Sequence, residues 1–437
     1  MSYLTTLREA GQDAQQLEMV YRAARQTGEQ TAFADAAHTC YSEAPENLLY
    51  AAWHFRLLEP IDLPALKRAI NWPLALLLAI PSGLIFWLLS DVERFHIYHN
   101  VPLLPLVGAA LSACLIMSFL SLASGQDRGR VAVVTLGLAA LVAYVILALR
   151  WLDNSIYVDH YAVLMIFHLA LLSWAGIGLF LLWNNDTAEN RFAFLTKSFE
   201  AIISGGLFLC AGVVFTLITL AMFQALGVTL PEAVHRLFVA GGAGLAPVLA
   251  VAMVYRPGVS PAQQEFGQGL SWLIATLLRL LLPLTLLALV VYLALIPFNF
   301  WEPFHNREVL IVYNAMLFAV IGLLVGVTPM HEADLAAAQR LWLRRGILAV
   351  SGLAVLVSLY TSAAILYRIG QGGLTPNRLT VIGWNLVNIA ILFLLLYKQG
   401  RAQPEEWLAA MRESVRLGTT IYVVWGLLVI IAIPLFF

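Results

Sequence analysis

The chain has 437 residues, of which 61% are hydrophobic and only 12% are charged, and its net charge is −1. Soluble domains carry about 25% charged residues. This composition, with a mean hydropathy of +0.81, therefore excludes an ordinary soluble protein and indicates an integral membrane protein. The net charge gives no reason to expect a nucleic-acid partner. The three cysteines lie far apart, at positions 40, 114 and 210, and predict neither a disulfide framework nor a metal site.

Residues 1–68 differ from the rest of the chain because they are rich in Gln, Glu, Ala and Arg. Apolar residues recur at helical spacing, for example at Leu17, Tyr21 and Ala24, and breaks fall at Gly28 and around Pro45. This pattern predicts three short helices. We interpret the region as a small cytoplasmic helical domain, which serves either as a cap or as a docking module for a protein partner.

Residues 69–437 contain eleven apolar runs of about 19 to 30 residues, against the roughly 20 that a membrane-spanning helix needs. The fold class predicted is therefore all-α, a polytopic transmembrane helix bundle. The runs cover residues 72–90, 101–124, 131–149, 159–183, 198–226, 232–255, 268–297, 307–327, 346–367, 377–397 and 417–436.

The run 232–255 is the least regular of the eleven, because Gly241, Gly242, Gly244 and Pro247 interrupt it. The sequence leaves open whether it spans as one helix, as a broken helix or as a re-entrant pair. The small residues at 240 and 244, and those at 322 and 326, fit close helix packing.

Basic residues are unequally distributed between the loops. With the N-terminus in the cytoplasm, the inner loops carry about twice as many Lys and Arg as the outer loops. This bias predicts a multi-pass protein of the bacterial plasma (inner) membrane with a cytoplasmic N-terminus. It also makes residues 403–415 a cytoplasmic interfacial helix and places Phe437 outside.

A polar motif, from Tyr367 to Arg378, connects the ninth and tenth apolar runs. Its glycines permit positive φ, and Pro376 is suited to the first turn of the next helix, which predicts a tight, ordered loop on the outer face. Its two arginines, Arg368 and Arg378, either anchor the helix ends at the lipid headgroups or clamp an anion at the outer mouth.

The residues Tyr367-Arg368, followed by Gly373-Leu-Thr-Pro-Asn-Arg378 and by Trp384, resemble the signature of an uncharacterised family of bacterial polytopic inner-membrane proteins, a domain of unknown function. In that family a GLT-x-x-R loop lies late in a bundle of many spans. The resemblance implies the fold class and the location, and it implies no activity.

The outer loops are short and rich in histidine, acidic and aromatic residues. A histidine pair three residues apart beside carboxylates can bind a divalent metal or sense acidity. Because the spacing is loose and no cysteine contributes, we predict no metal and favour anchoring in an aromatic belt. The outer-loop candidates are His96, His99, His160, Glu302 and His305.

Polar residues deep in the spans are the strongest functional candidates, because a charge at the bilayer centre costs on the order of 3 kcal/mol or more. Arg279 lies near the middle of the seventh run and His168 near the middle of the fourth, and Asn385 and Asn388 lie in the tenth. They are candidates to line a ligand path. Alternatively, Arg279 ties two helices together through backbone carbonyls. No acidic residue lies as deep, Glu200 being the nearest, so no carboxylate relay is predicted.

Motifs for nucleotide, serine-hydrolase and zinc-protease chemistry are absent from the sequence, and we predict no cofactor. We expect a multi-pass protein, surrounded by membrane lipids, that transports or binds a small anionic or amphipathic molecule. Two alternatives stay open. One is a non-transport subunit or sensor that recruits a partner through residues 1–68, and the other is a lipid-modifying intramembrane enzyme at the outer histidine and acidic loops.

Overall fold

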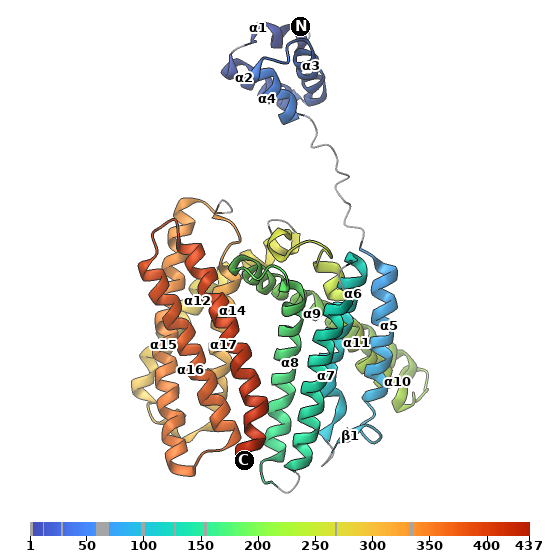
Figure 1. Ribbon diagram of the computed structural model, residues 1–437, viewed down its shortest axis with the longest axis vertical. Helices are drawn as coiled ribbons and strands as arrows, with labels where there is room; N and C mark the ends of the chain where they lie inside the picture. The colour runs from blue at the N-terminus through green and yellow to red at the C-terminus, as the bar shows by residue number, and fades with distance from the viewer. Residues whose placement is uncertain are drawn as a thin grey trace. The chain divides into compact units, whose positions relative to one another are not determined.

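The structure is a computed structural model that describes residues 3–11, 13–27, 29–57, 70–97, 101–125, 128–152, 155–266, 269–332 and 335–437. The chain divides into two compact units, Met1–Ile70 and Asn71–Phe437. In the described parts both units are helical, apart from one short hairpin of β1 (His96–Ile97) and β2 (Val101–Pro102) (Figure 1). Eleven helices are long and apolar enough to cross a membrane, which confirms the all-α polytopic architecture.

The first unit contains four described helices, so the prediction of three was wrong. They are α1 (Tyr3–Glu9), α2 (Ala14–Thr27), α3 (Gln30–Glu43) and α4 (Leu48–Leu57). Asp13 separates α1 from α2, because its side chain accepts hydrogen bonds from the backbone N–H groups of Gln15 and Gln16 and so begins a new helix. Phe33 and Trp53 pack edge to face in the core of this unit, with ring centroids 5.5 Å apart.

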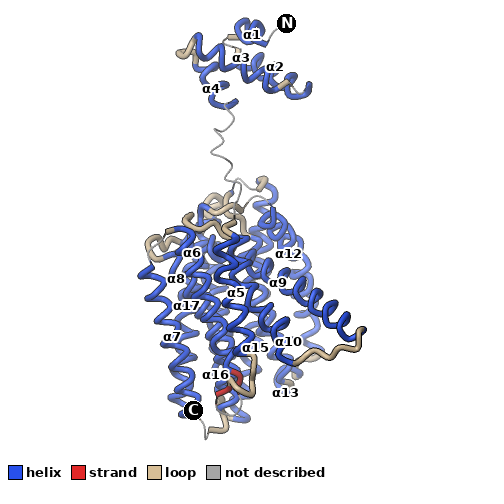
Figure 2. The backbone as a smooth tube through the Cα atoms, turned by 90° about the vertical axis from the view of Figure 1, so that its right-hand side faces the viewer, coloured by secondary structure: helices blue, strands red, loops and turns tan. Residues whose placement is uncertain are grey.

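The second unit contains one helical span for each predicted apolar run. The spans are α5 (Trp72–Leu89), α6 (Leu103–Ser124), α7 (Arg128–Trp151), α8 (Val158–Leu182), α9 (Ala188–Ala225), Glu232–Val254, α12 (Gly269–Leu295, extended to Phe298), α14 (Arg307–Val327), α15 (Ala337–Gly372), α16 (Pro376–Arg401) and α17 (Trp407–Phe436). Between spans the described residues also form two short helical elements, a 3₁₀ turn at Pro261–Gln263 and α13 (Glu302–His305). Of α9, only a small part of the apolar window is buried (11%), and Figure 2 shows its C-terminal half extending away from the other helices.

The irregular run spans as one continuous helix. It consists of α10 (Glu232–Arg236), a π-helical turn over Leu237–Gly241 and α11 (Gly242–Val254). Gly241 and Gly244 pack closely on α5 and do not break the helix: a Cβ added to Gly244 would lie 2.8 Å from Cβ of Phe86 and 3.0 Å from Cα of Gly83. The predicted close packing of this segment is confirmed, with α5 as the neighbour.

Helix ends near the C-terminus differ from the predictions. The loop predicted from Arg368 to Arg378 is only the three residues 373–375, because α15 continues to Gly372 and only Gly373 takes a positive φ, of 73°. Thr375 caps α16 and Pro376 is its first residue, as expected. Residues 403–415 form no separate interfacial helix, since Trp407 and Met411 are buried in the core and α17 is continuous.

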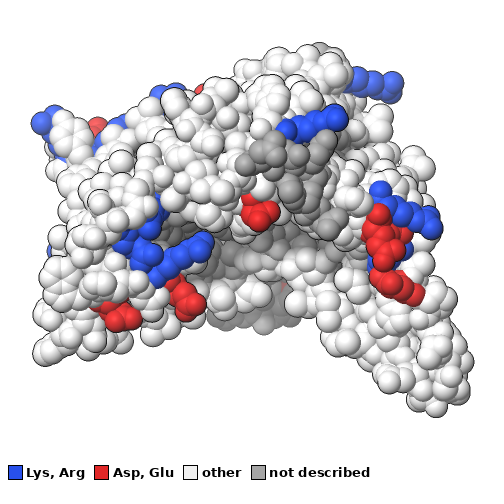
Figure 3. All heavy atoms as spheres, turned by 90° about the horizontal axis from the view of Figure 1, so that it is seen from below, with Lys and Arg blue, Asp and Glu red and all other residues white. Residues whose placement is uncertain are grey.

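Connections between spans lie at two ends of the second unit. The Arg191 end contains the connections α8–α9, α11–α12 and α16–α17, and the Arg368 end contains the connections α7–α8 and α15–α16 and the C-terminus. Figure 3 views the Arg368 end, on which charged side chains lie in small, separate groups on a largely uncharged surface.

Candidate functional site

A polar cluster lies at mid-depth between α8, α16 and α17. Trp384 donates its Nε1–H to Nε2 of His168 over 3.1 Å, and the other ring nitrogen of His168 lies 2.7 Å from the carbonyl oxygen of Leu164. Since a carbonyl only accepts and an indole N–H only donates, Nδ1 carries the proton, Nε2 is the acceptor, and the imidazole is neutral. Tyr422 donates its hydroxyl to Oδ1 of Asn388 over 2.6 Å, and its ring centroid lies 5.3 Å from that of Trp384.

The depth of this cluster follows from the helix bounds. His168 is about 15 Å from the start of α8 and Asn388 about 18 Å from the start of α16, at 1.5 Å per residue. Both positions are near the middle of their helices. The structure thus brings together predicted candidates from two helices, with Asn385 on the same helix one turn before Asn388.

Several polar atoms on α15 and α16 are buried without a hydrogen-bond partner among the described residues. They include both amide atoms of Asn385, Nδ2 of Asn388 and the hydroxyls of Ser358, Ser362 and Thr380. A buried unpaired polar group costs about 1 to 3 kcal/mol. Polar groups retained at such a cost make this part of the bundle a candidate for contact with a polar ligand.

An apolar groove of about 850 Å³ runs between α7, α8 and α17 and reaches the start of α9. Its volume lies within the roughly 300 to 1,000 Å³ of ligand sites. Its walls are leucine and valine side chains such as Leu138, Leu179 and Val424, and Gly176 lines one wall without a side chain. Tyr422 also lines this groove, so the groove meets the polar cluster at mid-depth.

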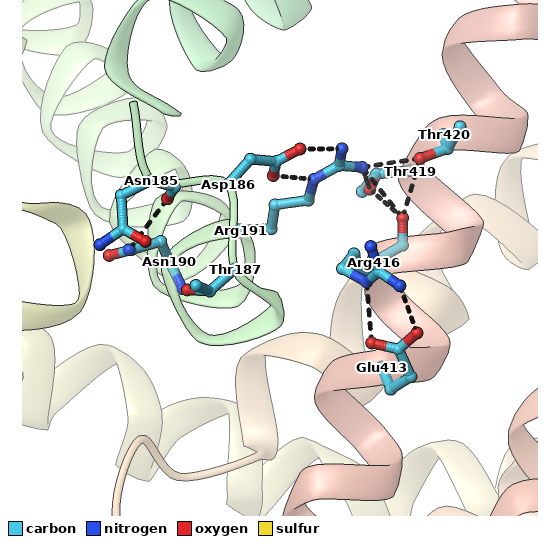
Figure 4. Close-up of polar contacts among 9 residues, drawn as sticks. All are labelled: Asn185, Asp186, Thr187, Asn190, Arg191, Glu413, Arg416, Thr419 and Thr420. Carbon is cyan, nitrogen blue, oxygen red and sulfur yellow. Dashed lines mark hydrogen bonds and ion pairs between the residues drawn. The ribbon is translucent and has the colours of Figure 1, made fainter. Parts of the chain in front are cut away.

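A network of charged and hydroxyl groups closes the groove at the Arg191 end (Figure 4). Arg191 forms a two-fold hydrogen-bonded ion pair with Asp186. Its Nη1 also donates to the hydroxyl of Thr420 over 2.6 Å and to the carbonyl oxygen of Arg416 over 3.1 Å. The side chain of Thr187 caps α9, which fixes Arg191 in the first turn of that helix. The network therefore joins α9 to α17.

The network changes the pKa of Asp186, which lies in the connection between α8 and α9. The hydrogen bond from Arg191 lowers the pKa of Asp186 below its usual value. Arg416 pairs in turn with Glu413 over 2.7 Å. The groove is thus amphipathic: it has an apolar body, a charged end and a polar contact at mid-depth.

Arg279 is placed differently from the other deep candidates. Its Nε donates to the carbonyl oxygen of Val327 over 3.2 Å, and Val327 is the last residue of α14. A cation at a helix C-terminus is stabilised by the unpaired carbonyls there. This contact ties α12 to α14, as in the structural alternative set out above, and Arg279 is not among the residues that line the groove.

The two arginines of the Tyr367–Arg378 motif donate hydrogen bonds to backbone carbonyls. Nη1 of Arg368 donates to the carbonyl oxygen of His305 over 2.9 Å, and Nη1 of Arg378 donates to that of Gly373. Beside them the rings of Phe300, Trp301, Phe304, Tyr360 and Tyr367 form a contiguous group. An aromatic group of this kind is typical of a membrane interface.

Of the remaining outer-loop candidates, His96 and Glu302 have local hydrogen-bond contacts. Nδ1 of His96 lies 2.9 Å from the carbonyl oxygen of Val92, and Glu302 accepts from the side-chain amide of Asn306 over 3.2 Å. Nδ1 of His160 is buried without a partner in the part of the chain that the structure describes. His99 lies outside the described residues. Within residues that are described, no three His, Cys, Asp or Glu side chains are grouped to hold a metal.

Sequence reasoning missed two features of the site. Arg191 was not among the candidates, because its partner Thr420 lies on a helix distant in sequence. Lys197 was not a candidate either, yet it forms a buried ion pair with Glu200, three residues later on α9. The signal available was the opposite charges at i and i+3 at the start of an apolar run.

Comparison of the chain with family models, with curated proteins and with solved structures finds no match. Membership of the family that the GLT-x-x-R motif resembles therefore stays a prediction.

Proposed function

We propose that the protein binds an amphipathic, lipid-like molecule in the groove between α7, α8 and α17 and moves its headgroup across the bilayer. The observation that carries the proposal is the position of Tyr422. It lines the groove and donates a hydrogen bond to Asn388 in the mid-depth polar cluster. The groove therefore offers polar contacts at its charged end and, about 3 Å further along α17 from Thr420, at Tyr422, which connects the groove to the buried polar cluster.

The mid-depth contact matters because the polar headgroup sets the free-energy barrier to moving a lipid from one leaflet to the other. Moving an uncompensated charge to the bilayer centre costs at least about 3 kcal/mol, whereas acyl chains stay in hydrocarbon throughout. The hydroxyl of Tyr422 on the groove wall, with the amide of Asn388 behind it, lowers that cost by replacing water as a hydrogen-bond partner. A protein that only anchored lipid at the interface would need the charged end and not the polar cluster.

The charged end fits a headgroup that carries both signs of charge. Asp186 and Glu413 balance Arg191 and Arg416, so these four residues sum to no net charge. A zwitterionic headgroup can exchange partners with such a pair, its phosphate with a guanidinium and its ammonium with a carboxylate. The Asp186 side chain is 43% exposed and is accessible for this exchange.

The direction of loading follows from the proposed orientation. With a cytoplasmic N-terminus in a bacterial inner membrane, as the distribution of basic residues predicts, the Arg191 end faces the cytoplasm. The headgroup is then taken from the inner leaflet.

The test is transbilayer movement of fluorescent phosphatidylethanolamine in vesicles that contain the purified protein. Leu179→Trp fills the groove from an exposed wall position, and Val163→Trp puts the same side chain on the same helix outside the groove. These residues are 56% and 55% exposed, so both variants are expected to fold. We expect movement with the wild type and with Val163→Trp and a loss of on the order of tenfold with Leu179→Trp. Equal rates for all three proteins would overturn the proposal.

A second candidate function, recruitment of a protein partner, is favoured by the surface of the first unit. Met19, Leu48 and Phe55 are 57%, 84% and 62% exposed there, although the unit has its own core. A photoreactive amino acid at Phe55 is expected to give a cross-linked species of defined mass in cells, and one at the exposed position Glu9 is not. Equal labelling at both positions would argue against a partner.

A further inference from the structure

A buried ion pair on α9 lies beside a second cavity. The side chains of Lys197 and Glu200 are each only 5% exposed, and Nζ of Lys197 lies 2.8 Å from Oε2 of Glu200. The cavity, of about 470 Å³, is lined by Lys197 together with Tyr255 and apolar side chains of α8, α9 and α11. The function proposed above does not use this pair.

The two partners of the pair are unequally satisfied. Lys197 also donates to the carbonyl oxygen of Glu265 and to the hydroxyl of Ser271, the latter over 3.1 Å, which accounts for its three N–H donors. Oε1 of Glu200, by contrast, is buried without a partner among the described residues. A carboxylate with one desolvated oxygen is costly, and a bound proton removes its charge.

The other charged groups on neighbouring elements have their own partners. The carboxylate of Glu265 is bound by Arg256 over 2.7 Å, outside the cavity. Arg416 on α17 pairs with Glu413 and approaches α9 at Arg191, about 9 Å along the helix from Lys197. α11 contributes no charged side chain, and α12 contributes the Ser271 hydroxyl. Lys197 is therefore the charged group that interacts directly with the carboxylate of Glu200.

The pair is connected to the groove through one aromatic wall. Trp174 and Phe194 line both cavities, their rings are stacked with centroids 5.4 Å apart, and Trp174 donates to the hydroxyl of Ser198 over 2.9 Å. Phe194 and Ser198 lie on α9 within one turn of Lys197. A change in the pair at this turn of α9 is thus positioned to move the wall of the groove.

We propose that Glu200, paired with Lys197, is a proton-binding site whose occupancy is coupled to the groove through the Trp174–Phe194 wall. The coupling rests on the proposed function, since it supplies that movement with an energy source. The proton is taken up by the carboxylate of Glu200 and no other bond changes. Lys197 keeps the Glu265 carbonyl and the Ser271 hydroxyl as acceptors when its counter-charge is neutralised.

The first test is infrared difference spectroscopy of the whole protein in lipid during a pH titration. We expect the C=O stretching band of a protonated carboxyl group to grow on acidification in the wild type. Part of that band is expected to be lost in Glu200→Gln and kept in Glu265→Gln, the matched carboxylate nearby. The double variant Lys197→Met/Glu200→Gln removes both charges, so no buried charge is left uncompensated, and it replaces Glu200→Gln in the test if that single variant misfolds. An unchanged band in Glu200→Gln would overturn the proton site.

The second test is the distribution of labelled lipid across vesicles under a gradient of one pH unit. With one proton per lipid, the gradient shifts the distribution by up to about tenfold, because one pH unit corresponds to about 1.36 kcal/mol. Glu200→Gln is expected to move lipid without responding to the gradient. Titration of Glu200 without lipid movement in the wild type would refute the proposed function and the coupling. Lipid movement without titration of Glu200 would refute only the proton site.

Discussion

Tyr422 on α17 donates a hydrogen bond of 2.6 Å to Asn388 on α16, at the point where the groove meets the buried polar cluster. The two helices follow one another in the sequence, and the contact joins them near the middle of each. It connects the wall of the groove with the buried polar cluster. Its loss is therefore expected to affect both stability and lipid movement.

Tyr422→Phe removes the donor and leaves Oδ1 of Asn388 buried and unpaired. We expect the free energy of unfolding to fall by about 1 to 3 kcal/mol and lipid movement to slow. Thermal unfolding in detergent and the vesicle assay measure the two effects. The control is Tyr144→Phe, which removes a hydroxyl that donates to the Ile431 carbonyl of the same helix from an exposed position. Equal losses in the two variants would contradict a special role for Tyr422.

Gly383 is expected to tolerate no side chain, because Trp425 packs on its backbone. A Cβ at this position would lie 1.8 Å from Cζ2 of Trp425. We predict that Gly383→Ala destabilises the α16–α17 contact by about 1 to 3 kcal/mol or more. Gly400→Ala on the same helix meets no atom within 4 Å and serves as the control. It is expected to leave the unfolding temperature nearly unchanged, and a similar loss in both variants would contradict the packing described.

The ion pair of Asp186 predicts a defined pH dependence. Because Arg191 lowers the pKa of Asp186 in the folded state, the pair stabilises the fold above the unfolded pKa of about 3.9. This contribution is lost as the pH falls through the lower, folded pKa. Asp186→Asn is expected to unfold at a lower temperature than the wild type at about pH 6, and the difference is expected to shrink at about pH 3. A difference that does not depend on pH would contradict the assignment.

The first unit is expected to lose its fold independently of the membrane unit. Trp53 is 6% exposed and lies in a core built only from residues of that unit. Trp53→Ala is predicted to cost about 3 to 5 kcal/mol and to make the N-terminal helices sensitive to protease. Fragments that span the membrane unit are expected to persist. Phe55→Ala, at a 62% exposed position, is the control and is expected to resist digestion like the wild type.

The spans were predictable from sequence because hydropathy and length alone specify a membrane-crossing helix. Helix ends were not, since they depend on caps and on packing. The predicted fifth run begins at residue 198, yet α9 begins at Ala188, where Thr187 provides a cap. In the same way α15 continues through the glycines at 370 and 372, which the sequence placed in a loop.

The candidate site was predictable only in part. His168 and Asn388 are recognisable because polar residues in the middle of an apolar run are rare. Tyr422 is not, since a tyrosine in a span has no distinguishing local pattern. Arg191 acquires its partners only when α17 packs against α9, a contact between residues 225 to 229 positions apart. No periodicity in the sequence reports such a contact.

The central claim is that a lipid-like molecule occupies the groove specifically, and photo-cross-linking tests it most directly. The probe is a phospholipid with a photoreactive acyl chain, incorporated in a membrane with the whole protein, and peptide mapping locates the adducts. We predict adducts concentrated on groove residues such as Leu179 and Val424 and reduced by Leu179→Trp. Adducts spread over the exposed faces of α9 and α12 in proportion to their area, and unchanged by that substitution, would show that lipid only surrounds the protein and would contradict the claim.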